Sequence, residues 1–446
     1  MYVMKERVFL VLYKVFFIGL LLQFFVYTFV TFQLGLDGLW ADVFWLRKEI
    51  MVIVGSLFAA WYIWQKKLRQ SKKAVWYVTL IFIALMVYGL LDTLFKWISI
   101  SWFIKAWKYD FIGYMIFLTT YYLSHNITPA KATGFMTWVM KTYKVLLVLA
   151  LLRYVMLSLK PGVLKLFGYD RMSIEGDIGQ RPPAVYRTRE FEWLPRNQFI
   201  FERPISRGFF LTAFFPLFFV QYLQRRSMKK TWFWRGVYAL NVIFTYSRAA
   251  WGSWIIELWI LWAVTYRKQM YFFVKKFLLP AFLILMAVAR IAKDQVINRE
   301  FSNTWHVQLL IQWWHYFSDN RLLGMGAWSV WPASHRAWWL SFNPENQFLQ
   351  IAIEFGIIWF LIWMTIYLRL HKIGFDTIRT QWKQKKLSLE SRYAIAFSIG
   401  MLGLSISGMV LHSFTDRMIV YPFMLVGGVV YYLLLHPHTS PVITKK

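Results

Sequence analysis

Residues Gly324 to Tyr367 read GMGAWSVWPASHRAWWLSFNPENQFLQIAIEFGIIWFLIWMTIY, and this stretch decides how the rest of the chain is interpreted. A Gly-x-Gly turn is followed by a polar and aromatic loop, and the tripeptide Pro344-Glu345-Asn346 then stands at the start of an apolar helix. That helix carries a second acid, Glu354, followed by Gly356. Polar groups at the point where a membrane helix meets water are costly unless they are used or paired. We therefore expect a membrane-embedded cavity built around this corner.

The composition is that of an integral membrane protein. The 446 residues are 59% hydrophobic and their mean hydropathy is +0.44, which is atypical of a soluble domain. Apolar runs of roughly 20 residues fit helices that cross a ~30 Å hydrocarbon layer, and they lack the alternation of outer-membrane strands. We predict an all-α polytopic membrane protein with about 12 transmembrane helices. The absence of cysteine excludes disulfides, thiolate metal sites and cysteine nucleophiles.

Cation-rich loops set the expected topology. They fall on every second connection, at 66–73, 225–230, 267–276 and 369–392, so the positive-inside rule places them and both termini in the cytoplasm. We expect a single membrane domain, 1–446, with two long extracytoplasmic segments at 160–207 and 292–346. The first apolar run lacks a small-residue cleavage site and is interpreted as a retained span. The predicted spans cover approximately 8–32, 50–64, 75–95, 111–123, a fifth ending near 159, 209–223, 232–246, 249–266, 277–291, 347–368, 393–411 and 419–435.

The formal charge of +30 has two interpretations. The cations can gather in cytoplasmic loops that face anionic lipid, or some of them can face an anionic substrate. Nucleic acid is not an expected partner, because the basic residues are scattered between spans and form no contiguous domain.

Arginine is frequent in the first extracytoplasmic segment, which a purely topological rule would leave poor in cations. The planar guanidinium suits bidentate binding of phosphate, and pairing with the acids of a folded loop is the alternative. Pairing explains Arg196 and Arg203 least well, because they stand closest to the membrane. The full set is Arg171, Arg181, Arg187, Arg189, Arg196, Arg203 and Arg207.

Arg248 lies between two apolar runs, in TYSRAAWGSW. An arginine at membrane depth costs roughly 2.5–3.5 kcal/mol on insertion scales. It either snorkels to the interface or forms a fixed cation at the floor of an outward-facing cavity.

The loop before Glu345 carries His335 and Arg336, which either contact a substrate or are simply solvated. The histidines of the outer segments match no compact metal-binding spacing. Four tryptophans of this loop either stack on sugar rings or belong to the aromatic belt of the interface: Trp328, Trp331, Trp338 and Trp339.

Four stretches resemble the motifs of the O-antigen ligase and polymerase superfamily of bacterial membrane glycosyltransferases. SRAAW at 247–251 is similar to its Ser-Arg-Gly/Ala motif. RNQFIFERPISRG at 196–208 keeps Arg, Phe, Pro and Gly at the family's spacing, although Phe199 and Ile205 stand where Gly and Asn are usual. The stretch 306–326 resembles an amphipathic segment that ends in Gly-x-Gly, with His306 replacing the usual Arg. NPENQFLQIAIEFGI at 343–357 resembles the family's His-Asn-x-x-Leu-Gln…Glu-x-Gly signature.

The resemblance implies glycosyl transfer at the outer face of the bacterial cytoplasmic membrane, from a glycan on undecaprenyl diphosphate to a sugar hydroxyl. It implies no metal or other cofactor, so Arg196, Arg203 and Arg248 would stabilise the diphosphate leaving group. Glu345 would act as general base, with Asn346 orienting it or the sugar. The alternative is that these two residues only favour and cap the helix start. Glu345 replaces the histidine of the ligases, which favours a surface-polysaccharide polymerase.

The expected partners are the lipid-linked oligosaccharide, a glycan acceptor, membrane lipids and a regulator of chain length. One alternative is an O-antigen-type ligase that attaches the glycan to another acceptor. The rival class is a transporter or flippase of lipid-linked sugars. Alternating access is disfavoured, because the charged groups concentrate at one face and the two halves of the chain do not look alike.

Overall fold

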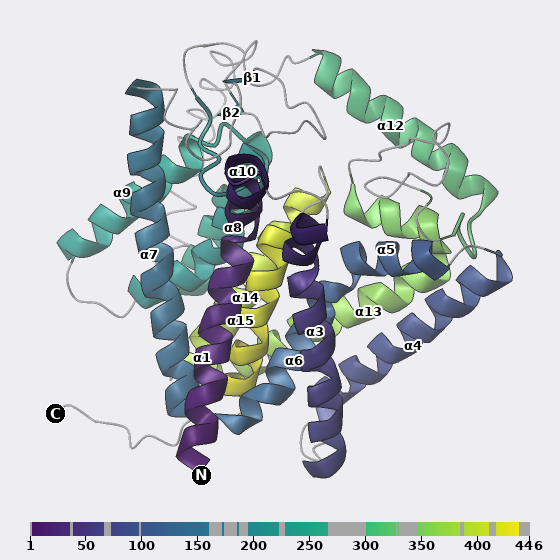
Figure 1. Cartoon of the computed structure of the whole chain (residues 1–446), viewed down its shortest axis with the longest axis horizontal. Coiled ribbons are helices and arrows are strands. Elements are labelled where there is room, and N and C mark those ends of the chain that lie inside the picture. The colour runs from purple at the N-terminus through teal and green to yellow at the C-terminus, as the bar shows by residue number, and fades with distance from the viewer. Residues whose placement is uncertain are drawn as a thin grey trace.

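A computed structural model of the chain describes residues 2–35, 39–66, 73–97, 100–159, 172–173, 185–186, 195–222, 228–265, 300–326, 329, 346–383, 388–409 and 416–436. The described part is built of helices, apart from a two-residue parallel pairing of β1 (Met172–Ser173) with β2 (Val185–Tyr186) (Figure 1). The all-helical architecture predicted from the sequence is therefore confirmed. In chain order the helices are α1 (Tyr2–Leu21), α2 (Gln23–Thr28), the π-helical turn η1 (Phe29–Gln33), α3 (Leu39–Lys66), α4 (Lys73–Phe95), α5 (Ile100–Asp110), α6 (Ile112–Leu123), the 3-10 turn η3 (Ser124–Asn126), α7 (Pro129–Leu159), α8 (Pro204–Tyr222), α9 (Met228–Ile243), α10 (Arg248–Thr265), α12 (Glu300–Asp319), α13 (Gln347–Lys383), α14 (Leu389–Gly408) and α15 (Arg417–Leu435).

Five stretches of described helix are long and apolar enough to cross a membrane: Glu6–Thr31, Val75–Phe95, Pro129–Leu159, Gln347–Asp376 and Met418–Leu435. The larger count of about 12 spans stays a prediction, and its proposed ninth span, 277–291, lies outside the described residues. The predicted span at 111–123 corresponds to α6, whose 12 residues make only ~18 Å of helix at 1.5 Å per residue. By its length α6 is too short to cross a ~30 Å hydrocarbon layer alone.

Helix α15 forms the centre of the bundle. Its apolar window is 94% buried, against 28% for α7, so α15 is enclosed by other helices while α7 leaves most of its surface outside. It packs against α6, α8 and α14. Rings from three helices stack there: Phe397 of α14 lies 6.2 Å from Phe117 of α6 and 4.6 Å from Phe423 of α15. Aromatic contacts of this kind give a core of fixed geometry.

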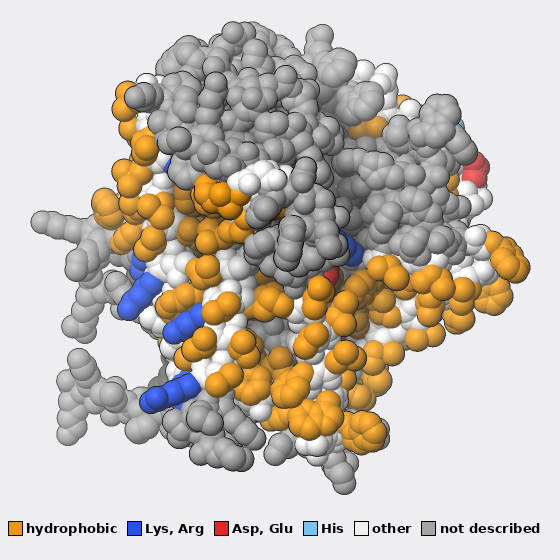
Figure 2. Space-filling model, viewed as in Figure 1, with side chains coloured by type: hydrophobic (Ala, Val, Ile, Leu, Met, Phe, Trp, Pro, Cys, Tyr) orange, Lys and Arg blue, Asp and Glu red, His pale blue; other side chains and the backbone are white. Residues whose placement is uncertain are grey.

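Peripheral helices expose apolar side chains in rows. On α4 the exposed residues include Leu80, Ile83, Val87, Leu91 and Leu94, which recur at the spacing of a single helical face. Figure 2 shows hydrophobic side chains along this part of the molecule. Such faces are unfavourable in water and are what a lipid-facing helix requires.

The beginning of α1 and the end of α15 lie at the same end of the bundle. Glu6 of α1 forms an ion pair with Lys131 at the start of α7, and the Tyr432 hydroxyl of α15 donates to the Ile127 carbonyl, 2.7 Å away, just before that helix. The 19 residues of α15 span ~28 Å. The start of α15, which Asp416 caps, therefore lies about one bilayer thickness away, at the opposite end of the bundle (Figure 1).

Candidate functional site

The opposite end of the bundle carries the candidate site. The structure describes four of the expected residues, whereas the other three lie outside the described part of the chain. The described residues are Arg196, Arg203, Arg248 and Asn346, and the others are Glu345, His335 and Arg336.

Asn346 caps α13 and joins it to a neighbouring helix. Its side-chain oxygen accepts hydrogen bonds from the backbone N–H groups of Phe348 and Leu349, at 3.0 and 3.1 Å. These are two of the donors that a helix start leaves unsatisfied. Its amide nitrogen donates to the Met409 carbonyl, 2.9 Å away, directly after α14. Asn346 thus has the expected alternative role of a helix cap, and it fixes the backbone that follows position 345.

A buried carboxylate not identified from the sequence lies beneath this helix start. Asp110, the last residue of α5, is 5% exposed, and its Oδ1 accepts from the side-chain amides of Gln347 at 3.0 Å and Gln350 at 3.5 Å. Both glutamines are fully buried, and residues three apart share one face of a helix. Burial raises the pKa of Asp110 to about 7, and the hydrogen bond from Gln347 opposes that rise. The only sequence signal was a lone acid before an apolar run.

Neighbouring polar contacts hold α5 in place. The Lys108 ammonium lies 2.8 Å from a carboxylate oxygen of Glu49 in α3. The Lys108 carbonyl accepts from the Tyr421 hydroxyl of α15 at 3.2 Å. Asp110 therefore belongs to a segment that is fastened on two sides, so it can act as a fixed support for the start of α13.

The Gly-x-Gly turn docks against a break in α13. Gly356 has φ 77° and ψ 176° within the helix, so the helical hydrogen bonding is interrupted there. Two carbonyls before the break accept hydrogen bonds from the loop instead. The Met325 N–H donates to the Ile353 carbonyl and the Gly326 N–H donates to the Glu354 carbonyl, both at 2.7 Å. A Cβ on Gly356 would lie 2.1 Å from the carbonyl oxygen of Leu322. Only glycine allows this backbone conformation and this close approach. The two glycine motifs of the sequence are thus parts of one joint.

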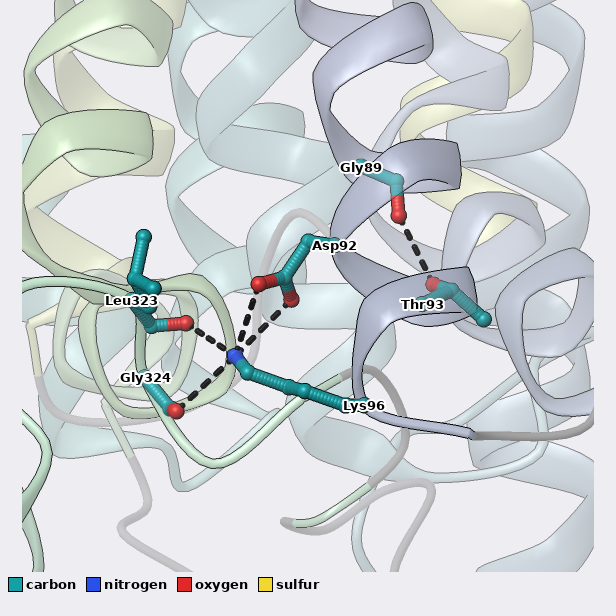
Figure 3. Close-up of polar contacts among 6 residues, drawn as sticks. All are labelled: Gly89, Asp92, Thr93, Lys96, Leu323 and Gly324. Carbon is teal, nitrogen blue, oxygen red and sulfur yellow. Dashed lines mark hydrogen bonds and ion pairs between the residues drawn. The ribbon is translucent and has the colours of Figure 1, made fainter.

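Lys96, at the end of α4, fastens the same loop from the other side (Figure 3). Its ammonium group contacts both carboxylate oxygens of Asp92, at 2.8 and 2.9 Å, and donates to the carbonyls of Leu323 and Gly324. Three N–H donors suit one carboxylate and two carbonyls. The loop that braces the α13 break is therefore tied to α4, a candidate membrane span.

Arg196 supports the turn that presents Arg248. Its Nε and one Nη donate to the carbonyls of Thr245 and Tyr246, at 3.1 and 3.2 Å. Tyr246 has a φ of 50°, a left-handed conformation that is uncommon for this residue type. Arg248, the first residue of α10, has an exposed side chain. At least part of the Arg196 guanidinium thus serves the backbone, and Arg248 is the more accessible of the two cations.

Arg203 lies near the start of α15. Its guanidinium is 3.9 Å from a carboxylate oxygen of Glu202. The neighbouring Asp416 caps α15 by accepting from the Met418 N–H at 3.0 Å. Burial raises the pKa of Asp416 to about 6, against the effect of a hydrogen bond from Ser206 and of the Arg203 charge. Arg203 thus stands in a mixed cluster of one cation and two acids.

The two parts of the site are linked by a short segment of the chain. Met409, which accepts from Asn346, and Asp416, which lies near Arg203, are separated by only six residues. A fully extended connection of this length spans at most ~25 Å. The helix starts of α13 and α15 therefore lie at the same end of the bundle.

Two further ionisable groups are buried inside the bundle. Arg207, in the first turn of α8, is 2% exposed and donates to the side-chain oxygen of Asn241. Glu257 of α10 is 1% exposed and faces α14, where a Cβ on Gly403 would lie 1.7 Å from its Oε1. Glu257 was not among the residues expected to form the site, although an acid within an apolar run is itself a functional signal.

The described residues contain no group of three His, Cys, Asp or Glu side chains close enough to hold a metal ion. Comparison of the chain with known family models and with curated proteins finds no match.

Proposed function

We propose that the chain is a membrane glycosyltransferase that polymerises glycan units at the outer face of the bacterial cytoplasmic membrane. The donor would be a glycan on undecaprenyl diphosphate and the acceptor a sugar hydroxyl. The observation that carries the proposal is the pairing of the motif segments. Arg196 binds the turn before Arg248, and the Gly-x-Gly turn binds the carbonyl of Glu354. Each pairing holds together two motif segments that are apart in the sequence, as a shared site would need.

The proposed role of the arginines is to stabilise the departing diphosphate. Negative charge that develops on a leaving group is met best by cations that are already in place. Arg248 suits this role because its side chain is exposed at a helix N-terminus, where the helix dipole adds to its charge. Arg203 is the second candidate, and Arg196 would act mainly by holding the turn.

The proposed general base is Glu345. As the acceptor hydroxyl attacks the anomeric carbon and the bond to the diphosphate breaks, a carboxylate takes the hydroxyl proton. Asn346 and Asp110 fix the helix start that follows Glu345. Asp110 is a positioning residue in this proposal, since its hydrogen bonds go to Gln347 and Gln350. His335 and Arg336 remain candidates for contact with the sugar.

The test uses the purified full chain, reconstituted in vesicles with a lipid-linked oligosaccharide, and reads product length on a gel. We expect wild type to give a ladder and Glu345→Gln to lose it. Glu390→Gln is the matched control, because Glu390 lies in the first turn of α14, at the other end of that helix from Met409. A ladder made by Glu345→Gln at the wild-type rate would refute the base. A single transferred product would indicate a ligase, and transbilayer movement without transfer would indicate a flippase.

A further inference from the structure

Helix α12 has three distinct faces. Its polar face carries the exposed side chains of Gln308, Gln312, His315 and Asp319. Their spacing of three and four residues places them in one row along the helix. The other two faces are both apolar, but only one of them packs against the protein.

The inner apolar face holds α12 to the joint at the α13 break. Leu309 is buried against Ile353 of α13, and Met325 of the Gly-x-Gly turn packs against the same pair. Trp313 and Phe317 stack with ring centroids 5.1 Å apart beside them. This contact explains one apolar face of α12.

The outer apolar face has no such contact in the described part of the chain. Leu310, Ile311 and Trp314 are 49%, 55% and 55% exposed, and together with Trp313 they line a shallow hollow of about 370 Å³. Exposed apolar area costs roughly 25 cal/mol per Å² in water. A row of large apolar residues on one side and polar residues on another is typical of a helix that lies in a membrane interface.

The end of α12 lies close to the exposed apolar row of α4, a candidate membrane span. After α12 the chain exposes Leu322 and Leu323, at 64% and 49%. The Leu323 carbonyl accepts from Lys96 at the end of α4 (Figure 3). The exposed row of α4 ends there in Leu94 and Phe95, at 48% and 80%. Exposed apolar side chains therefore stand next to each other at the end of a candidate membrane span and directly after α12.

We propose that α12 lies in the plane of the membrane boundary, with Leu310, Ile311 and Trp314 inserted among the acyl chains of the bilayer. Its polar face then points to water, and its inner face holds the Gly-x-Gly turn at the level of the boundary. The occupant of the outer face is membrane lipid, because the end of α12 lies close to the exposed apolar row of α4. The inference does not depend on the proposed reaction.

The chain contains no cysteine, so a single introduced cysteine gives a unique label. Four variants, Ile311→Cys, Trp314→Cys, Gln312→Cys and His315→Cys, would carry a nitroxide in vesicles of phosphatidylethanolamine and phosphatidylglycerol. Collision with oxygen, which concentrates in lipid, is compared with collision with a water-soluble nickel chelate. Leu91→Cys on the exposed face of α4 is the lipid reference.

We expect the oxygen-to-nickel ratio at positions 311 and 314 to approach that of position 91 and to exceed that at 312 and 315 several-fold. Equal ratios at all four α12 positions, or a nickel preference at 311 and 314, would overturn the proposal. Spin–spin broadening at position 314 that disappears on dilution with unlabelled protein would also overturn it, because a second copy of the chain would then be the occupant. All four positions are exposed, so the variants are expected to fold.

Discussion

Replacing Gly356 by alanine should release the Gly-x-Gly turn from α13. The new Cβ would lie 2.1 Å from the Leu322 carbonyl oxygen. It cannot rotate away, because the backbone of residue 356 fixes its position and the oxygen is itself a backbone atom. The φ of 77° and ψ of 176° add about 1–3 kcal/mol of strain for any residue other than glycine. The change that costs less free energy is separation of the Gly-x-Gly turn from α13. It breaks three backbone hydrogen bonds, which are donated by the N–H groups of Met325, Gly326 and Ile357. At about 1 kcal/mol each, the cost is about 3 kcal/mol.

Hydrogen exchange of the peptide covering 320–326 measures this cost directly. A loss of about 3 kcal/mol in local opening free energy increases exchange about a hundredfold. Gly134→Ala is the matched control, because Gly134 is an exposed residue inside α7 with no atom within 4 Å of an added Cβ. There we expect a change of no more than ~1 kcal/mol, in the stabilising direction. Unchanged exchange at 320–326 in Gly356→Ala, or an equal increase in the control, would refute the docking argument.

Asp110→Ala should lower the thermal unfolding temperature, because two buried amides lose their acceptor at about 1–3 kcal/mol each, whereas Asp110→Asn keeps an acceptor and should lie near wild type. Lys96→Met should destabilise the protein by about 1–3 kcal/mol, and adding Asp92→Asn should recover part of that loss in a double-mutant cycle; strictly additive effects would contradict the contact. The raised pKa of Asp416, about 6 against the ordinary 3.8, means that the folded state holds a proton between these values. The contribution of Asp416 to the free energy of unfolding is present below pH ~4 and is lost as the pH rises through ~6. Asp416→Asn should remove that part of the pH dependence in unfolding scans.

Local patterns in the sequence predicted the helices well where a single stretch decides the outcome. The apolar run after Asn346 predicted α13, and the capping alternative for this residue matches its two hydrogen bonds. The glycines at 324, 326 and 356 were singled out as motif residues, and all three have positive φ. Such features are encoded by residues close together in the chain, so spacing is sufficient to find them.

Contacts between distant segments could not be predicted in the same way. Asp110 and Gln347 are 237 residues apart, and no periodicity connects an acid in one helix with an amide in another. The expected role of Arg196 in binding diphosphate stays a prediction, and the structure adds hydrogen bonds from its guanidinium to backbone carbonyls 49 and 50 residues away. The predicted role of a guanidinium depends on which acceptors the fold places beside it, and this is a property of tertiary packing.

The count of about 12 spans stays a prediction, and helix length bears on one of its members. The prediction treated each apolar run as a crossing, whereas α6 has only 12 residues and follows α5 after Phe111. A short apolar helix buried by its neighbours has the same hydropathy as a lipid-facing one, since both avoid water. Burial, which separates them, is not visible in the sequence.

The tie between Lys96 and the Gly-x-Gly loop has a consequence for biogenesis. Lys96 and Gly324 are 228 residues apart, so at about 5–20 residues per second the loop leaves the ribosome roughly 10–45 s after the lysine. During that interval the ammonium group is compensated by Asp92, one turn earlier in the same helix. The first spans can therefore enter the bilayer with this charge already paired. The joint at α13 can close only after residues 324–356 have been synthesised, so a chain truncated before Gly356 lacks this joint.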